Sequence, residues 1–223
     1  MAHPQLLTKD FSKKYMHWDI LDQARLAFLP CLSFTKAENF YLAGGTGLAI
    51  QLGHRDSIDF DFFKEGDISP DEVFERLQEA SKSHEMLIIQ KEKNTLSVLV
   101  DGVIKLSFFG YKHPLLFPAI VTEHILIASL LDIAAMKFAA ITSRSLEKDY
   151  VDIFYLLKNA SLTDLLQTTK QKLPELDKSV VLKALVYFDD VEREHILFRE
   201  GYVVDFEDVQ IFLRSEVTAL LKS

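Results

Sequence analysis

Two aspartates separated by a single residue are the groups in this sequence that could do chemistry. Asp59 and Asp61 alternate with aromatic residues in the run Ser57 to Phe63, SIDFDFF, and this alternation predicts a strand. Side chains two residues apart on a strand face the same way, with Cα atoms about 6–7 Å apart. Such a pair can bind hard divalent cations, and Mg²⁺ prefers carboxylate oxygens together with substrate phosphates. One such triplet is expected by chance, so its surroundings decide its meaning.

A glycine pair lies upstream, after the buried run NFYLA (Asn39 to Ala43), which predicts a strand. Gly44 and Gly45 open a helical pattern, and a helix N-terminus offers backbone N–H groups to phosphate. Thr46 can cap this helix and donate its hydroxyl to a phosphate oxygen. Turn glycines and surface aspartates are each common by themselves. With only thirteen residues between Gly45 and Asp59, the combination favours one shared site.

Basic residues form a second group downstream. If Asp132 to Arg144 is helical, Lys137 and Arg144 share a face. Continuing the helix would add Lys148 to that face, with Asp152 one turn beyond. Three cations on one face suit a triphosphate, with Lys137 as a point charge. The alternative is a set of solvated surface charges.

Three polar residues stand immediately before the aspartates. Arg55 is expected either to orient the carboxylates or bind phosphate, or to form a structural ion pair. Ser57 is a candidate phosphate ligand, and His54 is interpreted as a turn residue. No H-E-x-x-H or C-x-x-C spacing is present, which argues against zinc catalysis.

The elements that must position these groups divide the chain in two. The first 116 residues contain strand and helix patterns, and the remainder is predominantly helical. We predict an α/β unit over 1–116 and a helical unit over 117–223 packed against it. The expected elements are a helix over 11–32, a strand at 39–43, a helix from 46 ended by Gly53, a strand at 57–63, a helix over 69–83, three strands over 84–109 with a two-residue Asp101-Gly102 hairpin turn, and helices over 125–144 and 146–159 followed by three shorter ones.

Composition sets outer limits on function. The 223 residues are 48% hydrophobic with formal net charge −8, which predicts a folded core and disfavours broad binding to nucleic-acid backbones. The last 35 residues hold 4 basic and 9 acidic groups, so a local basic pocket elsewhere remains compatible with this balance. The single cysteine, Cys31, and the absence of an apolar leader or spanning segment predict a cytoplasmic protein with no membrane association.

The segment GGTGLAIQLGHRDSIDFDFF resembles the signature of the polymerase-β-like nucleotidyltransferase superfamily. It is most similar to AbiEii/AbiGii-type nucleotidyltransferase toxins, which carry G-G-(T/S)-x-L-A followed by (H)-R-x-S-x-D-(I/L/F)-D-(L/F)-F. Similar stretches follow in DIAAMK through Arg144, in KDYVD before FYLL, and in YFDDVE. The resemblance spans about Phe40 to Glu192, most of the chain.

This resemblance implies an α/β (α+β) nucleotidyltransferase fold, in which a mixed sheet with flanking helices precedes a helical half. It implies catalytic roles for Asp59, Asp61, Lys137, Asp149 and Asp152, metal binding by Asp59 and Asp61, and nucleotide binding by Gly44, Gly45, Thr46, Arg55, Ser57, Arg144 and Lys148. Many members of the superfamily place a third carboxylate on a later strand. Here Ser107 stands at that position and Asp101 is a weak substitute, so Asp149 or Asp152 would have to serve.

The implied activity is Mg²⁺- or Mn²⁺-dependent transfer of a nucleoside monophosphate from a nucleoside triphosphate (NTP) to an acceptor hydroxyl, with tRNA as one acceptor. The implied setting is a bacterial toxin–antitoxin or phage-defence system with an antitoxin partner. Two alternatives stay open. The chain could modify a small molecule such as an antibiotic, or it could be a catalytically inactive nucleotide-binding or interaction protein.

Overall fold

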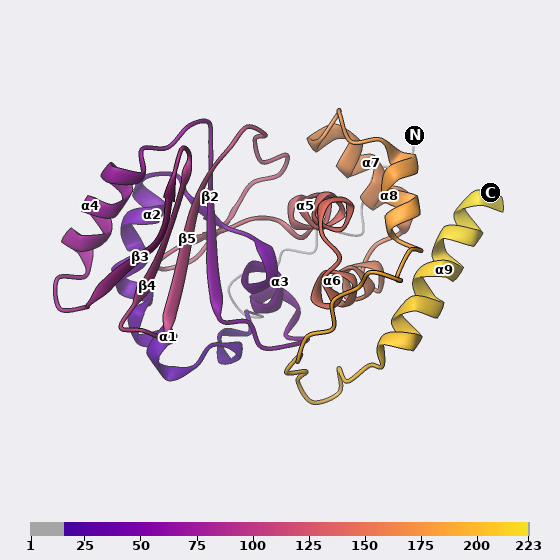
Figure 1. Cartoon of the computed structure of the whole chain (residues 1–223), viewed down its shortest axis with the longest axis horizontal. Helices are drawn as coiled ribbons and strands as arrows, with labels where there is room; N and C mark the ends of the chain where they lie inside the picture. Colours follow the sequence, from indigo (N-terminus) through magenta and orange to yellow (C-terminus); the bar gives the residue numbers. More distant parts are fainter. Residues whose placement is uncertain (1–15, 223) are drawn as a thin grey trace.

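Seven strands form one mixed sheet at the centre of the computed structural model, which describes residues 16–222 (Figure 1). Its strand order is β3-β4-β5-β2-β1-β7-β6. The strands are β1 (Tyr41–Leu42), β2 (Asp59–Glu65), β3 (Met86–Glu92), β4 (Thr95–Val100), β5 (Ile104–Tyr111), β6 (Ile120–Val121) and β7 (Leu126–Ile127). The helices are the 3₁₀ turns η2 (Trp18–Ile20) and η3 (Leu29–Leu32), and α1 (Gln23–Phe28), α2 (Ser33–Ala37), α3 (Gly44–Leu52), α4 (Pro70–Ala80), α5 (Leu130–Ser143), α6 (Glu147–Leu157), α7 (Leu162–Lys172), α8 (Lys178–Ala184) and α9 (Phe206–Lys222).

Strand β2 lies inside the sheet, antiparallel to β1 and parallel to β5. In the β2–β5 register, Asp59 pairs with Lys105 and Asp61 pairs with Ser107. Residues paired in this way lie on the same face of neighbouring strands. The register therefore brings a lysine and a serine beside the two aspartates.

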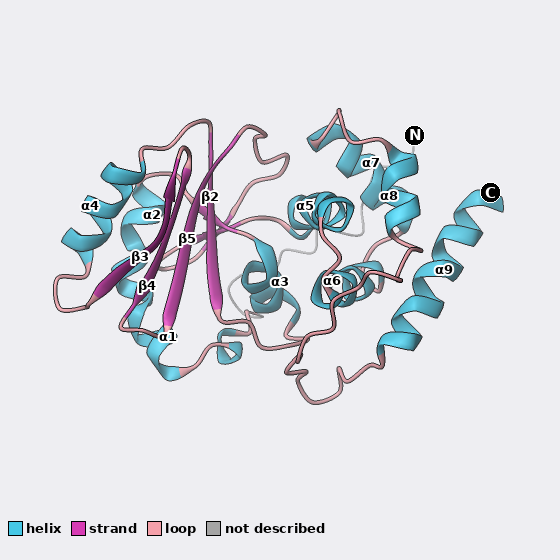
Figure 2. Ribbon diagram, viewed as in Figure 1, coloured by secondary structure: helices cyan, strands magenta, loops and turns pink. Residues whose placement is uncertain are grey.

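The two faces of the sheet have different neighbours (Figures 1 and 2). Helices α1, α2 and α4 lie on one side of strands β3, β4 and β5, and α3 and α5 lie on the other side of the sheet, next to the remaining C-terminal helices. Phe60 and Phe62 of β2 are fully buried with Phe108 of β5, where Phe62 and Phe108 stack with ring centroids 5.5 Å apart. This aromatic packing fixes β2 from behind, so the aspartates on its opposite face are held rigidly.

Most expected elements of the first half are confirmed. The strands at 39–43 and 57–63, the helix after the glycine pair and the helix beginning at Pro70 are present, and the three apolar runs form an antiparallel β3–β4–β5 sheet. The turn after Val100 holds Asp101 and Gly102 at positive φ, and with Val103 it is three residues long rather than the two predicted.

Three expectations for local structure are wrong. The helix predicted over 11–32 is broken within the described residues into η2, α1 and η3, because Asp22 caps a new helix and Pro30 enters the next turn. Residues Leu126–Ile127 form β7 rather than helix. Helix α5 ends at Ser143 with Arg144 extended, so it does not continue to Lys148.

Strands β6 and β7 follow residue 116 and complete the sheet. The division of the chain at residue 116 into two units stays a prediction. In the described part of the chain, none of the helices combines the length and apolar character needed to cross a bilayer.

Candidate active site

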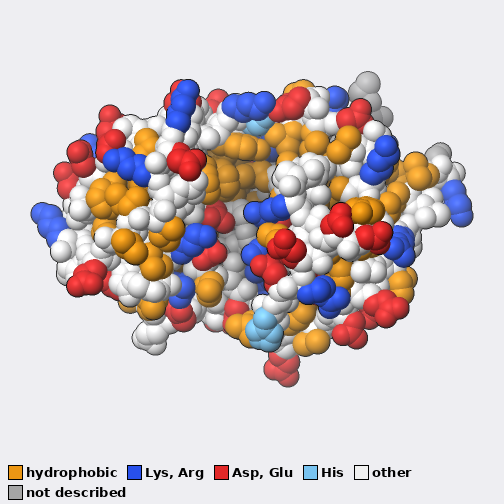
Figure 3. Space-filling view, viewed as in Figure 1, with side chains coloured by type: hydrophobic (Ala, Val, Ile, Leu, Met, Phe, Trp, Pro, Cys, Tyr) orange, Lys and Arg blue, Asp and Glu red, His pale blue; other side chains and the backbone are white. Residues whose placement is uncertain are grey.

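A cleft of about 690 Å³ opens between the exposed face of the sheet and helices α3, α5 and α6. The space-filling view shows a central groove with acidic side chains on its floor and basic side chains along one wall (Figure 3). Ten of the predicted site residues line it: Gly44, Gly45, Thr46, Arg55, Ser57, Asp59, Asp61, Lys137, Arg144 and Lys148. The structure thus brings together groups that lie as much as 104 positions apart along the chain.

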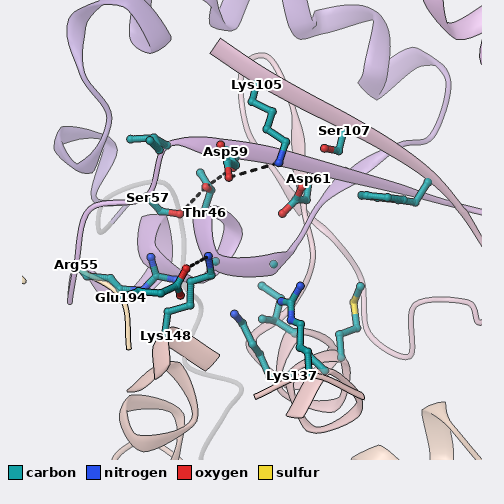
Figure 4. A pocket seen from close by; sticks show the side chains of 18 of the residues that line it. Thr46, Arg55, Ser57, Asp59, Asp61, Lys105, Ser107, Lys137, Lys148 and Glu194 are labelled. Atoms are coloured by element: carbon teal, nitrogen blue, oxygen red, sulfur yellow. Dashed lines mark hydrogen bonds and ion pairs between the residues drawn. The ribbon is translucent and has the colours of Figure 1, made fainter. Parts of the chain in front are cut away.

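The two aspartates lie on one face of β2 and point into the cleft (Figure 4). The Asp59 side chain is 44% exposed, and its carboxylate lies 4.0 Å from Lys105 Nζ. Burial, and then the like charge of Asp59, raise the pKa of the Asp61 carboxyl. A bound cation would offset both effects, so this carboxylate pair favours a positive ligand.

Within residues 16–222, no group of three or more acidic, histidine or cysteine side chains is arranged to hold a metal. Ser107 pairs with Asp61 in the register of β5 and β2, and it is buried against Ser97 with the two Oγ atoms 3.3 Å apart. Asp59 and Asp61 are therefore the carboxylates that this face of β2 offers to a cation. Substrate phosphate oxygens would supply further ligands.

The glycine pair forms the first turn of α3 next to the aspartates. Gly44 has φ +61°, and a Cβ added there would lie 3.1 Å from Asp61 Oδ2. A Cβ at Gly45 would lie 2.5 Å from Arg55 Nη2. A larger residue at Gly44 would be strained by the positive φ, and one at Gly45 would have to displace the Arg55 guanidinium.

Thr46 lies within α3 rather than at its cap, which is Ala43 without a side-chain bond, so the predicted capping role is wrong. The Thr46 hydroxyl donates to the Asp59 carbonyl and lies 2.8 Å from Ser57 Oγ. These bonds tie the start of β2 to the helix. Thr46 thereby positions Asp59.

Lys137 and the two later aspartates form a buried network behind the cleft wall. Lys137 Nζ lies 2.7 Å from Asp149 Oδ1 and 2.5 Å from Asp152 Oδ2, and both carboxylates are fully buried. Arg144, whose side chain is about half exposed, binds Asp149 from the cleft side at 2.8 Å. Neither Asp149 nor Asp152 lines the cleft, and both carboxylates are engaged in ion pairs with Lys137, Arg144 or Arg55.

Asp152 also holds the residues that precede β2. Arg55 Nε and Nη2 donate to its two carboxylate oxygens at 2.7 and 2.9 Å, and His54 Nε2 lies 2.8 Å from Oδ1. Burial opposes ionisation of Asp152, but the charges of Arg55 and Lys137 outweigh burial and hold the pKa of this carboxyl well below its ordinary value. His54 lies in a bend after α3, and its side chain is a buried member of the network that is inaccessible to solvent.

The titration of this network predicts acid sensitivity. Burial lowers the pKa of His54 below 6.5, so below that pH the unfolded chain binds a proton that the folded chain does not. The low pKa of Asp152 also destabilises the folded state in acid, below about pH 4. The ionised carboxylate stabilises the fold fully above the pKa of the unfolded chain, and this stabilisation is lost as the pH falls. We expect the urea midpoint to fall steadily from pH 7 to pH 4. A midpoint that is constant or higher at pH 5 would contradict this assignment.

Lys148 reaches the cleft from α6 and binds Glu194 at 3.1 Å. Glu194 belongs to the segment between α8 and α9, which passes along the cleft at residues 194–197. This segment accepts a hydrogen bond at the Leu197 carbonyl from the N–H of Asp56, three residues before β2. This segment therefore forms one rim of the cleft. Sequence reasoning missed it because its pattern carries no functional signal.

Lys105 was also missed, although the predicted strand over 103–109 placed it two residues before Ser107 and hence on the same face. Its side chain is 46% exposed and directed at the aspartates (Figure 4). The pairing of this strand with β2 was the information needed to find it.

Comparisons with known proteins identify relatives of this chain in sequence and in structure. The profile of the family described as nucleotidyl transferase AbiEii toxin, type IV toxin–antitoxin system, matches residues 28–221. The uncharacterized protein aq_aa25 of Aquifex aeolicus is 36% identical over 205 residues, which cover 90% of this chain and 97% of that protein.

Two solved structures share the fold. JHP933 from Helicobacter pylori aligns with a TM-score of 0.56 at 19% identity, over 91% of this chain and 94% of that one. MenT4, the nucleotidyltransferase toxin Rv2826c from Mycobacterium tuberculosis H37Rv, aligns with a TM-score of 0.59 at 14% identity, over 86% and 82%. With the family profile covering most of the chain, the protein belongs to the AbiEii family of nucleotidyl transferase toxins, and its enzyme class is nucleotidyltransferase.

Proposed function

We propose that the protein transfers a nucleoside monophosphate from a Mg²⁺- or Mn²⁺-bound NTP to an acceptor hydroxyl, with release of pyrophosphate. The observation that carries this proposal is the arrangement of one cleft. Two carboxylates on one face of β2 form the floor of this cleft. The N-terminus of α3, which begins with two glycines, lies beside them, and basic side chains line the edge of the cleft.

The residues present fit a divalent cation. Asp59 and Asp61 are hard oxygen donors held on one strand face. Burial, and then the charge of Asp59, raise the pKa of Asp61, and a bound cation would offset both effects. When bound there, the ion would polarise the α-phosphate and lower the pKa of the attacking hydroxyl. Asp59 and Asp61 would hold it together with phosphate oxygens.

The remaining groups would bind and orient the triphosphate. The first backbone N–H groups of α3, at Gly44 and Gly45, lie beside Asp61 and suit phosphate oxygens. Arg144 and Lys148 are the half-exposed cations across the cleft, and they can move from their carboxylate partners to the departing pyrophosphate. Lys137 is buried in its ion pairs, so we assign it to holding the wall and contributing charge through it.

We further propose a cytoplasmic bacterial toxin whose acceptor is an RNA such as tRNA and whose activity an antitoxin opposes. The family supports the toxin role. The cleft supports a short contact: its basic groups lie at one place, while the chain as a whole carries net charge −8. Such a distribution favours phosphates bound at one pocket over a long nucleic-acid track.

Incubation of the protein with α-labelled NTPs and separate pools of small RNA, protein and small hydroxylated molecules tests this function. Label appearing in the small-RNA pool is the expected result. Label in the small-molecule pool would instead favour modification of a compound such as an antibiotic. Mg²⁺-dependent NTP binding without label in any pool would favour the non-catalytic alternative, for which Ser107 in place of a third acid is the supporting observation.

Lys105→Ala is expected to strengthen Mn²⁺ binding about threefold to tenfold, because it removes a competing cation 4.0 Å from Asp59 in a solvent-screened position. A titration followed by Mn²⁺ electron paramagnetic resonance measures this directly. Lys91→Ala, on the exposed edge strand β3, is the matched control. Equal or weaker Mn²⁺ binding by the Lys105 variant would show that Lys105 does not compete for the carboxylates.

A further inference from the structure

The cleft changes character along β2. Ser57, Asp59, Asp61 and Phe63 follow one another at every second residue and all line it. Hydroxyl and basic groups gather at the Ser57 end, the carboxylates occupy the middle, and an aromatic wall of Phe63, Phe109 and Tyr111 closes the other end. The space-filling view shows hydrophobic side chains lining the groove beyond its acidic floor (Figure 3).

The rings of this wall stand side by side across the sheet. Phe63 stacks between Tyr41 and Phe109, with ring centroids 6.1 and 5.1 Å apart. Among residues 16–222, Phe63 is the one ring in contact with Phe109. On its other side Phe109 pairs in register with Thr95 of β4, a small side chain. One face of the Phe109 ring is thus left without an aromatic neighbour, and the residue as a whole is only partly buried.

The spacing matches the shape of a nucleotide. Phe109 lies two residues beyond Ser107, so the aromatic row is one side-chain step, about 7 Å along the strands, from the Asp61 row. If the α-phosphate of a nucleotide lies at the two carboxylates, its ribose covers this distance along the strands and its base lies past the ribose. Gln90 and Ser97 also line the cleft, level with Ser107 in the strand register and so one step short of Phe109.

We propose that Phe109, supported by Phe63, is the stacking site for the base of the NTP. This inference rests on the proposed NTP substrate and assigns the orientation of that substrate in the cleft. The triphosphate lies toward Ser57, Arg144 and Lys148, and the base lies against the face of the Phe109 ring turned away from Phe63. Stacking on a ring face accepts every base, because each has a π-face.

Isothermal titration calorimetry in Mg²⁺ separates the two ends of the ligand. The α,β-methylene analogue of ATP carries a base and resists transfer, whereas inorganic tripolyphosphate carries only the phosphates. Phe109→Leu keeps apolar volume but removes the ring, and we expect it to weaken analogue binding about 10-fold while tripolyphosphate binds as in the wild type. Phe109→Tyr should restore analogue affinity, and Tyr187→Ala, an exposed aromatic between α8 and α9, is the control.

Wild-type analogue affinity in the Phe109→Leu variant would overturn the proposed base site. So would an equal loss of tripolyphosphate affinity, because the substitution would then act on the phosphate end or on the fold. A variant that keeps analogue affinity but loses affinity for a single-stranded oligonucleotide would assign the ring to the acceptor instead. The proposed transfer activity has a separate test: it is refuted if the wild type binds the analogue but transfers no label from an NTP.

Discussion

Asp59→Asn is expected to reduce nucleotidyl transfer by about 10³-fold or more without unfolding the protein. The substitution removes one negative charge from the carboxylate pair proposed to bind the metal, and metal charge stabilisation is worth several kcal/mol in such reactions. The Asp59 side chain is 44% exposed and its ion-pair partner Lys105 is 4.0 Å away, so stability should change by only about 0.5 kcal/mol. Transfer of α-label and a urea melt of the same sample measure the two effects.

Asp208→Asn provides the matched control for this substitution. Asp208 is an exposed residue in the first turn of α9 and does not line the cleft. Its replacement should leave transfer within about twofold of wild type, since it touches none of the proposed ligands. Full activity in the Asp59 variant would remove the metal assignment, whereas equal loss in both variants would point to a general effect of lost charge.

Asp152→Ala is expected to destabilise the fold by about 3–5 kcal/mol, because it leaves Arg55 and Lys137 buried with one carboxylate partner fewer. The free energy of unfolding of an ordinary domain is about 5–15 kcal/mol, so this loss is a large part of it and the variant should be prone to unfold at 37 °C. Asp152→Asn keeps the side-chain shape and can still bond to His54, so its loss should be smaller. Chemical denaturation of both variants measures the difference.

An exposed ion pair supplies the comparison. Asp71 on α4 pairs with Lys91, and its side chain is 71% exposed, so Asp71→Ala should cost no more than about 1 kcal/mol. If Asp152→Ala were equally mild, the buried network would not be the element that holds Arg55 and the cleft wall in place. The expected order of stability is wild type, Asp71→Ala, Asp152→Asn and then Asp152→Ala.

The sequence predicted what depends on local spacing. The alternation of Asp59 and Asp61 with Phe60 and Phe62 follows from the two-residue period of a strand, and the structure has the same pattern of burial. The glycine pair was predicted at the start of a helix because of its place between a strand and an apolar helical run. Both features are set within twenty residues of chain.

The side chains that strand pairing brings together could not be predicted from the local sequence pattern. Lys105 stands opposite Asp59 and Phe109 opposite Phe63 because β5 joins β2 in one particular parallel register, some 46 residues later in the chain. A shift of the register by one residue would have turned both side chains to the other face. The two-residue alternation along a single strand does not determine which of these registers forms.

The later acids illustrate a second limit. Asp149 and Asp152 are three residues apart on α6, so helical spacing gives both the same side of the helix. The side facing the cleft wall is filled by Lys137 and Arg55, which take up both carboxylates. The break at Arg144 adds a further limit, because it places Lys148 on α6 rather than on the helix that carries Lys137. Only the packed structure distinguishes a ligand from a buried counter-ion here.

The most direct test of nucleotidyl transfer compares NTP labelled at the α-phosphate with NTP labelled at the γ-phosphate, in Mg²⁺ with the small-RNA pool. The α-label should become bound to the acceptor, while the γ-label should appear only in pyrophosphate. Transfer of the γ-label to the acceptor, or release of both labels without an adduct, would contradict the proposed reaction at Asp59 and Asp61.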